Sequence, residues 1–555
     1  MKIKINRWIL ATVMAACAVA TARADVMFGT ERGRWLAEAE EATPQLKETV
    51  VRPVAVVRAV NDTAAYQHWR YDAAGDPADM LYNRNFKEIK EITLDFGRHL
   101  TGYFTFHTRT LNRCQDAPVR IRFFFGEMPA ELNTPLDPWP GTLSRAWMQD
   151  ETVTVTETDR DITIPRRLAF RYLKIELLGA SPDFDFAIDD ARFTAVTSAD
   201  AVQTDLAPAC PEKIRAIHDV GLETLRECMQ TVFEDGPKRD HRLWAGDLYL
   251  QALANRHSFR NFALTRRCLY LFAALADDDG IVISNIFESP EPHAQTGSYC
   301  LSYSLLWNST LLEYLKDTGD TATAAELWPV ARRQVEYALG YVDSNSLFDI
   351  NRRDRGVWLF FDWRDGLDTA APMQGATIFA IDQTYELARM LGKEKEVSHW
   401  PGISRRMKQA ARRHMYDRKQ CVVVSGPGRQ VSALGQSWMT KAGVLTTKEA
   451  RRAITTALAS ETTVMPGTPY GTHYLIDAML VAGMNDEARR YLEDYWGGMV
   501  DKGADTFWES YDPDDDFISA YRFSPLNSSC HAWSCTPVYF IHAYPAIFQS
   551  AAALQ

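Results

Sequence analysis

The chain has 555 residues, of which 46% are hydrophobic and 24% are charged, and its formal net charge is -11. This composition is typical of a globular protein, and the length predicts more than one domain. An acidic chain lacks the basic surface that a phosphate backbone requires, so nucleic acid is excluded as the expected partner.

The N-terminus has the pattern of a secretory signal. Basic residues precede an apolar stretch at 8–20, and Ala22-Arg23-Ala24 resembles a small-residue cleavage site. The apolar stretch is short for a membrane span. We therefore expect residues 1–24 to be removed and the mature chain to be exported to the periplasm or secreted. Lipidation at Cys17, which lies in a lipobox-like sequence, is the alternative.

The cysteine pattern indicates neither a disulfide scaffold nor a zinc site. Nine cysteines are present, and Cys17 leaves with the signal if cleavage follows Ala24. The others are scattered over four hundred residues and include no two C-x-x-C pairs, which argues against structural zinc. Export permits one or two disulfides, but the sequence does not say which cysteines pair.

Residues 50–197 have the pattern of strands. Apolar and polar residues alternate at 89–97, 102–108, 119–126 and 170–178, with many β-branched residues and with glycines at the boundaries. Several short strands at fairly regular intervals predict an antiparallel β-sandwich. The residues between the signal and position 50 show little pattern.

From residue 208 to residue 555 the pattern is helical. Ile378, Ile381 and Tyr385 keep spacings of three and four, which place them on one helix face. About a dozen helices are predicted, as six helical hairpins require. The expected helices cover 214–225, 247–257, 263–276, 303–316, 322–341, 378–391, 403–415, 432–444, 448–460, 473–481, 486–497 and 531–548.

The strongest candidate site is the charged segment 234–247. Gly236-Pro237 forces an irregular backbone, so this segment is predicted to be a loop that presents its side chains. The alternative is a solvated charged surface. Apolar sequence on both sides favours a pocket instead, because charges held between core segments must be paired or used.

Three further clusters place a carboxylate or a histidine beside aromatic rings. A carboxylate can accept sugar hydroxyls while a ring covers an apolar sugar face. The alternative for each cluster is an ordinary core position, and the aspartates at 512–516 fit a solvated turn better than a calcium loop. The clusters contain Asp362 and Trp363, Trp508 and Glu509, and His531 and Trp533.

The segment Asp-x-Pro-x-Arg-Asp, followed by Arg, Trp and Gly-Asp, resembles the signature of the α-L-rhamnosidases of glycoside hydrolase family 78. The resemblance implies a β-sandwich followed by an (α/α)6 barrel catalytic domain. It places the general acid at Asp240, where the family more often has glutamate, so His241 and Asp235 stay open as alternatives. The Thr-x-Trp-Glu segment implies Glu509 as the general base.

The same resemblance implies a carbohydrate substrate and an inverting reaction, in which two carboxyl groups flank the scissile bond. No motif for an organic cofactor and no metal site is identified. Two other functions stay open, namely a glycosidase of the same fold for another sugar and an inactive sugar-binding protein. The residues expected to contact the sugar are Asp235, Arg239, Trp244, Asp247, Asp362, Trp363, Trp508, His531 and Trp533.

Overall fold

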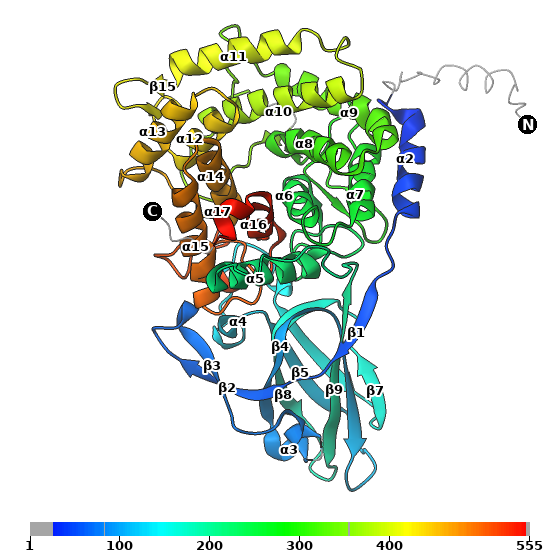
Figure 1. Cartoon of the computed structure of the whole chain (residues 1–555). Helices are drawn as coiled ribbons and strands as arrows, with labels where there is room; N and C mark the ends of the chain where they lie inside the picture. The colour runs from blue at the N-terminus through cyan, green and yellow to red at the C-terminus, as the bar shows by residue number, and fades with distance from the viewer. Residues whose placement is uncertain (1–25, 83, 353–355, 551–555) are drawn as a thin grey trace, which may run out of the picture.

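The computed structural model describes residues 26–82, 84–352 and 356–550. An antiparallel sheet domain lies at one end of the molecule and a helical domain at the other (Figure 1). The predicted signal at 1–24 and Cys17 lie outside the described residues. Within the described ranges, no helix is both long and apolar enough to cross a membrane.

The sheet domain is built around one long strand, β4 (Glu91–Thr110). This strand pairs with β8 (Leu168–Gly179) over its first half and with β9 (Phe186–Thr197) from Gly102 onward, so it joins both parts of the sheet. A Cβ atom at Gly102 would lie 2.0 Å from the carbonyl oxygen of Thr194, so only glycine permits this close approach. The sandwich prediction is confirmed.

The strand order is β1-β9-β4-β8-β5-β6, with β2 and β7 also paired with β4 and with β3 paired with β2. Alternate residues of these strands face a core that is rich in phenylalanine. The remaining elements of this domain are β1 (Lys47–Val51), β2 (Ala55–Asn61), η1 (Tyr66–His68), β3 (Trp69–Ala73), η2 (Ala78–Leu81), α3 (Phe86–Ile89), β5 (Val119–Gly126), α4 (Pro129–Asn133), η3 (Arg145–Trp147), β6 (Gln149–Val155) and β7 (Arg160–Thr163).

The helical domain has two concentric layers. Helices α6, α8, α10, α12 and α14 pack each against the next, and the turn η5 (Ala532–Ser534) with the helix α16 that follows it closes the ring between α14 and α6. The helices between them form an outer layer. The bounds are α5 (Glu212–Cys228), α6 (Ala245–Asn255), α7 (Phe262–Ala274), α8 (Leu301–Thr318), α9 (Thr321–Leu339), α10 (Ala370–Met390), α11 (Trp400–His414), α12 (Ala433–Lys441), α13 (Thr447–Leu458), α14 (Pro469–Val481), α15 (Asn485–Asp501) and α16 (Pro537–Ala543).

The two layers differ in their burial pattern. The inner helix α14 is buried along almost its whole length, whereas the outer helix α11 buries only one face, at Trp400, Ser404, Met407 and Ala411. A helix that is apolar on all sides belongs inside a ring, and an amphipathic helix covers the ring from outside. This arrangement of twelve helices in the described residues is the predicted (α/α)6 barrel.

Short strands and turns lie in the loops between the barrel helices. One of them, η4 (Ser524–Leu526), contacts α4 of the sheet domain. These elements are β10 (Leu243–Trp244), β11 (Asn285–Phe287), β12 (His293–Ala294), β13 (Tyr299–Cys300), β14 (Val357–Trp358), β15 (Tyr416–Asp417), β16 (Val422–Val423), η4 (Ser524–Leu526) and η5 (Ala532–Ser534).

The structure corrects two expectations. The region before residue 50 contains α2 (Gly29–Glu41), which lies beside α7 and buries Trp35 and Ala39, one turn apart (Figure 1). The last predicted helix, 531–548, is interrupted. Its first part forms η5, and α16 is followed by the separate turn α17 (Pro545–Phe548). Proline at 537 and 545 explains both starts, because proline lacks the N–H that a helix interior needs.

Candidate active site

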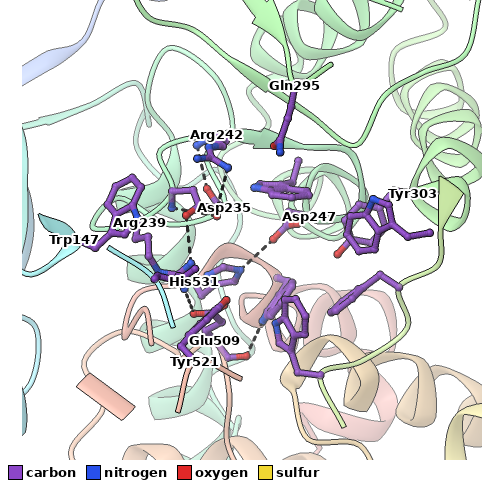
Figure 2. A pocket seen from close by; sticks show the side chains of 17 residues that line it. Trp147, Asp235, Arg239, Arg242, Asp247, Gln295, Tyr303, Glu509, Tyr521 and His531 are labelled. Atoms are coloured by element: carbon purple, nitrogen blue, oxygen red, sulfur yellow. Dashed lines mark hydrogen bonds and ion pairs between the residues drawn. The ribbon is translucent and has the colours of Figure 1, made fainter. Parts of the chain in front are cut away.

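A cavity of about 290 Å³ opens at the barrel mouth that faces the sheet domain (Figure 2). Most of the predicted site residues line it, together with others that sequence reasoning did not assign to the site. The predicted ones are Asp235, Arg239, Asp240, Trp244, Asp247, Trp363, Glu509, His531 and Trp533. The others are Leu143, Trp147, Arg242, Gln295, Tyr303, Trp358, Phe360 and Tyr521.

Asp235 closes the loop that carries the predicted acid. One of its carboxyl oxygens accepts a hydrogen bond from the backbone N–H of Arg242 at 3.0 Å, and the other accepts one from the N–H of Asp240 at 3.3 Å. A Cβ atom at Gly236 would lie 2.5 Å from the carbonyl oxygen of Arg239, so the loop is too tight there for any other residue. The loop thereby turns Arg239 and Asp240 toward the cavity.

Asp235 itself is buried, and it keeps its proton at neutral pH. Burial, followed by the nearby charges of Asp240 and Asp247, raises its pKa to about 8, although His531 acts in the opposite direction. A neutral carboxyl group can donate a hydrogen bond as well as accept one. The site therefore contains at least one carboxyl group, that of Asp235, that is protonated at neutral pH.

Glu509 is held as an anion by three donors. Its Oε2 atom lies 2.5 Å from Arg239 Nη2 and accepts a hydrogen bond from the N–H of Ser528 at 3.0 Å, while the hydroxyl of Tyr521 donates to Oε1. Burial works to raise its pKa, but Arg239, His531 and these hydrogen bonds outweigh it and lower the pKa to about 2. Glu509 is therefore ionised across the physiological pH range.

The guanidinium of Arg239 joins the two predicted catalytic carboxylates. Its Nη2 atom contacts Glu509, and its Nη1 atom lies 3.2 Å from Asp240 Oδ1. The ring of Tyr521 lies under the same guanidinium, 4.3 Å from its carbon to the ring centroid. Arg242 contacts the other oxygen of Asp240 at 3.4 Å. Asp240 and Glu509, far apart in sequence, thus lie on either side of one cation.

Asp247 and His531 form a second buried pair. His531 Nε2 lies 3.3 Å from Asp247 Oδ1, and both side chains are almost fully buried (Figure 2). Burial works to lower the pKa of His531, but the hydrogen bond to Asp247 and the charges of Glu509 and Asp247 raise it overall. The N–H of Ala532 donates to the carbonyl oxygen of Asp235 at 2.7 Å, which ties this segment to the loop of the predicted acid.

Aromatic rings close the deep end of the cavity. Trp244 packs edge to face against Tyr303 and Trp358, with centroids 6.3 and 6.4 Å apart. Phe360 stacks on Trp533 at 5.7 Å, and the indole N–H of Trp533 donates to the carbonyl oxygen of Glu509 at 3.0 Å. Charged groups on one side and rings on the other are the two surfaces that a monosaccharide requires.

Two family models match the chain. The model described as the glycosyl hydrolase family 78 alpha-rhamnosidase N-terminal domain matches residues 53–195, and the bacterial alpha-L-rhamnosidase 6 hairpin glycosidase domain matches residues 210–544. The chain belongs to glycoside hydrolase family 78. It is a glycosidase, as the sequence motifs predicted. No protein of curated function matches it.

Solved structures agree with this assignment. The chain is similar to the rhamnosidase from Klebsiella oxytoca with rhamnose bound, with 38% identity, a TM-score of 0.87, and coverage of 92% of this chain and 99% of that one. The family 78 rhamnosidase of Bacillus sp. GL1 shares the fold at 21% identity and a TM-score of 0.67. This match covers 81% of the family 78 chain described here and 46% of the Bacillus chain.

Two residues predicted to contact the sugar do not line the cavity of this family 78 glycosidase. Asp362 accepts hydrogen bonds from the N–H of Gly467 at 2.8 Å and from the hydroxyl of Thr468 at 2.6 Å, so its carboxylate anchors the loop before α14. Trp508 stacks on Tyr66 of the sheet domain, with ring centroids 4.1 Å apart. Their positions support structural roles.

His241, the alternative acid, is also outside the cavity lining. Burial and then the neighbouring charge of Arg167 lower its pKa to about 3. A histidine with that pKa has no proton to donate at neutral pH. The choice of acid is therefore between Asp240 and Asp235.

Sequence reasoning missed Tyr521 and the two residues from the sheet domain, Leu143 and Trp147. Tyr521 and Leu143 lie in loops and Trp147 ends the short turn η3. None of these segments has periodicity or charge clustering, so no local signal marks them. Among the described residues, no group of three or more His, Cys, Asp or Glu side chains is arranged to hold a metal ion.

Proposed function

We propose that the protein removes terminal α-L-rhamnose from glycosides with inversion, using Asp240 as general acid and Glu509 as general base. The observation that carries the proposal is the guanidinium of Arg239, which contacts both carboxylates at the lining of one cavity. Because both carboxylates contact one guanidinium, they lie close enough to act on the same glycosidic bond. Inverting glycosidases hold a water molecule between carboxyl groups roughly 6.5–9.5 Å apart, and the inverting reaction is the one that the resemblance to the family 78 rhamnosidases implies.

The base has its charge in place before substrate binds. Glu509, with a pKa of about 2, accepts a proton from water that attacks the anomeric carbon. Arg239 and Tyr521 hold the carboxylate by its two oxygens, which fixes its direction. Positioning of this kind contributes to the rate because no side chain has to reorganise during the reaction.

Asp240 is favoured over Asp235 as the acid because of where each carboxyl group is held. Both oxygens of Asp235 accept backbone N–H groups of its own loop, which directs the carboxyl group toward the backbone. Asp240 accepts only side-chain contacts from Arg239 and Arg242 and is less buried. Asp235 then serves to place Asp240 and to hold a proton next to it.

The deep end of the cavity suits a 6-deoxy sugar. The methyl group of L-rhamnose needs an apolar surface, which the rings around Tyr303 and Trp533 supply. Its hydroxyl groups need polar partners, which Asp247 and His531 supply as a buried pair. The rhamnose named with the Klebsiella oxytoca structure supports this choice of sugar.

The proposal includes export. It rests on the basic residues, apolar stretch and Ala-Arg-Ala sequence of residues 1–24. Mass spectrometry of protein recovered from the periplasm or medium tests it. A mature N-terminus at Asp25 is expected, and an intact N-terminus in the cytosol contradicts export.

The substrate is tested by hydrolysis of a panel of aryl glycosides by the mature protein. Release from the α-L-rhamnoside and not from other sugars is expected, and turnover of a different glycoside alone contradicts the choice of rhamnose. The acid is tested with good and poor leaving groups, because a good leaving group departs without protonation. Asp240→Asn should lose far more activity on the poor leaving group, and the same selective loss in Asp235→Asn would reverse the assignment.

A further inference from the structure

The sheet domain supplies one wall of the cavity. Leu143 and Trp147 are the two lining residues that come from this domain, and both belong to the segment between α4 and β6. The remaining lining residues belong to the barrel and its loops. A domain that served only as a platform for the barrel would not need to present side chains to the site.

This wall is fixed to the barrel. The N–H of Thr142 donates to the carbonyl oxygen of Tyr521 at 3.0 Å, and the ring of Trp139 packs edge to face on Phe523 with centroids 5.3 Å apart. The indole N–H of Trp139 also donates to the carbonyl oxygen of Leu143 at 2.9 Å. Since the hydroxyl of Tyr521 holds Glu509, the wall is attached to the residue that positions the base.

The wall lies beside the acid. The ring of Trp147 meets the ring of His241 edge to face at 6.1 Å, and His241 follows Asp240 directly in the chain. Figure 2 shows Trp147 on one side of Arg239 and Asp235, with Asp247 and Tyr303 on the other. A general acid protonates the leaving oxygen, so the leaving group extends past Asp240 toward Trp147.

The opposite end of the cavity cannot take the leaving group. Asp247, His531 and Tyr303 are only 2–3% exposed there, so this end is closed and fits a terminal sugar. At the other end Trp363 is 40% exposed, and its ring lies 6.2 Å from that of Tyr521. The open end is therefore the one that Leu143 and Trp147 border.

We propose that Leu143 and Trp147 form a leaving-group subsite that favours an aromatic ring on the glycosidic oxygen over a second sugar. This inference rests on the proposed function. A second sugar would need polar partners for its hydroxyls. Leu143 and Trp147 carry no hydroxyl, amide or charged group, and the guanidinium of Arg239 and the hydroxyl of Tyr521 are engaged with Asp240 and Glu509. An indole and a leucine offer a flat apolar surface on which an aromatic ring packs.

The test compares kcat and KM for phenyl α-L-rhamnoside and for a rhamnosyl-glucose disaccharide in the parent protein and in Trp147→Ala. The ratio of kcat/KM for the two substrates should fall about tenfold in the variant, the scale of a lost apolar contact in an enzyme pocket. Most of the change should come from the KM of the phenyl substrate. Trp147→Phe keeps a flat ring and should restore most of the ratio.

Arg145→Ala is the matched control, because Arg145 lies in the same segment but does not line the cavity and contacts Asp137 and Asp150 instead. Its ratio should equal that of the parent. Calorimetric binding of free L-rhamnose confirms that the sugar end is intact in each variant. A ratio in Trp147→Ala within twofold of the parent, or an equal loss on both substrates, overturns the subsite. Failure of the parent to cleave either rhamnoside overturns the proposed function itself, so the two failures are distinguishable.

Discussion

Lys238 and Arg239 are consecutive buried cations in one loop, yet they serve different parts of the molecule. Lys238 is 1% exposed and turns toward the sheet domain, where its Nζ atom lies 3.0 Å from Glu127 and 3.2 Å from Glu131. Arg239 turns the other way and contacts Asp240 and Glu509. The same loop therefore joins the two domains with one residue and holds the two carboxylates of the proposed acid and base with the next.

Lys238 and Arg239 are both buried and charged, so burial and charge do not by themselves mark a residue of the active site. The lysine pairs lie outside the cavity lining and also include hydrogen bonds to the carbonyl oxygens of Pro525 and Asn527, which fix the barrel loops in place. The arginine pairs line the cavity. Breaking the contacts of Lys238 should mainly lower the free energy of unfolding, and breaking those of Arg239 should mainly slow the chemical step.

The largest expected effect is that of Glu509→Gln, which breaks the pair on the cavity side. An amide cannot accept a proton from water, so kcat should fall by about 10²–10⁴-fold. Steady-state kinetics on an aryl rhamnoside measures this, with thermal unfolding as the check on folding. Tyr521→Phe, which removes one hydrogen bond and keeps the carboxylate, is the control and should lose much less. Equal losses in both variants would argue against Glu509 as the base.

The next effect is that of Lys238→Met, which breaks the pairs on the domain side. It leaves Glu131 buried without a cation and leaves Glu127 with His99 alone, which lies 3.0 Å from it. Removal of one partner from a buried ion pair costs about 3–5 kcal/mol of the free energy of unfolding. Denaturant titration measures the loss. Glu131→Gln is the matched control. Burial raises the pKa of Glu131 to about 7, so part of its charge is already absent at neutral pH and the variant should lose less.

A kcat loss in folded Lys238→Met as large as that in Glu509→Gln would contradict the division of roles between the two cations. It would mean that the domain contact also sets the geometry of the carboxylates.

The smallest effect is a pH dependence that Asp235 imposes. Its pKa of about 8 means that the protonated form is lost as the pH rises through about 8, so kcat/KM should fall there. Glu509, with a pKa of about 2, adds no acid limb above about pH 3. In Asp235→Asn, whatever activity is left should lack the alkaline limb. Persistence of the limb in that variant would assign it to another group.

The sequence predicted the helices and strands well because their periodicities are local. It failed where a segment is ordered by distant contacts. Trp35 and Ala39 of α2 are buried because this helix packs against α7, which its own sequence does not reveal. The segment at His531 forms a turn in place of a helix because it is hydrogen-bonded to the loop of Asp235. Proline at 537 and 545 is the local signal for this break, because each proline starts a new helical turn.

The candidate site was predictable to the extent that its residues cluster in sequence. Asp235, Arg239, Asp240 and Asp247 share one short loop, and Glu509 has a tryptophan neighbour. Asp362 has the same kind of aromatic neighbour, but its carboxylate accepts hydrogen bonds from the backbone N–H groups of Gly467 and Thr468, which no local pattern reveals. Trp147 comes from the other domain, and its place in the cavity depends on how the two domains pack.

The most direct test of the central claim is the configuration of the first product, measured by proton NMR on freshly mixed enzyme and α-L-rhamnoside. If Glu509 activates water across the anomeric carbon from Asp240, β-L-rhamnose appears first and α-L-rhamnose follows by mutarotation. If α-L-rhamnose appears first, the two carboxylates do not act as an inverting acid and base. The proposal that Arg239 positions Asp240 and Glu509 for that reaction is then wrong.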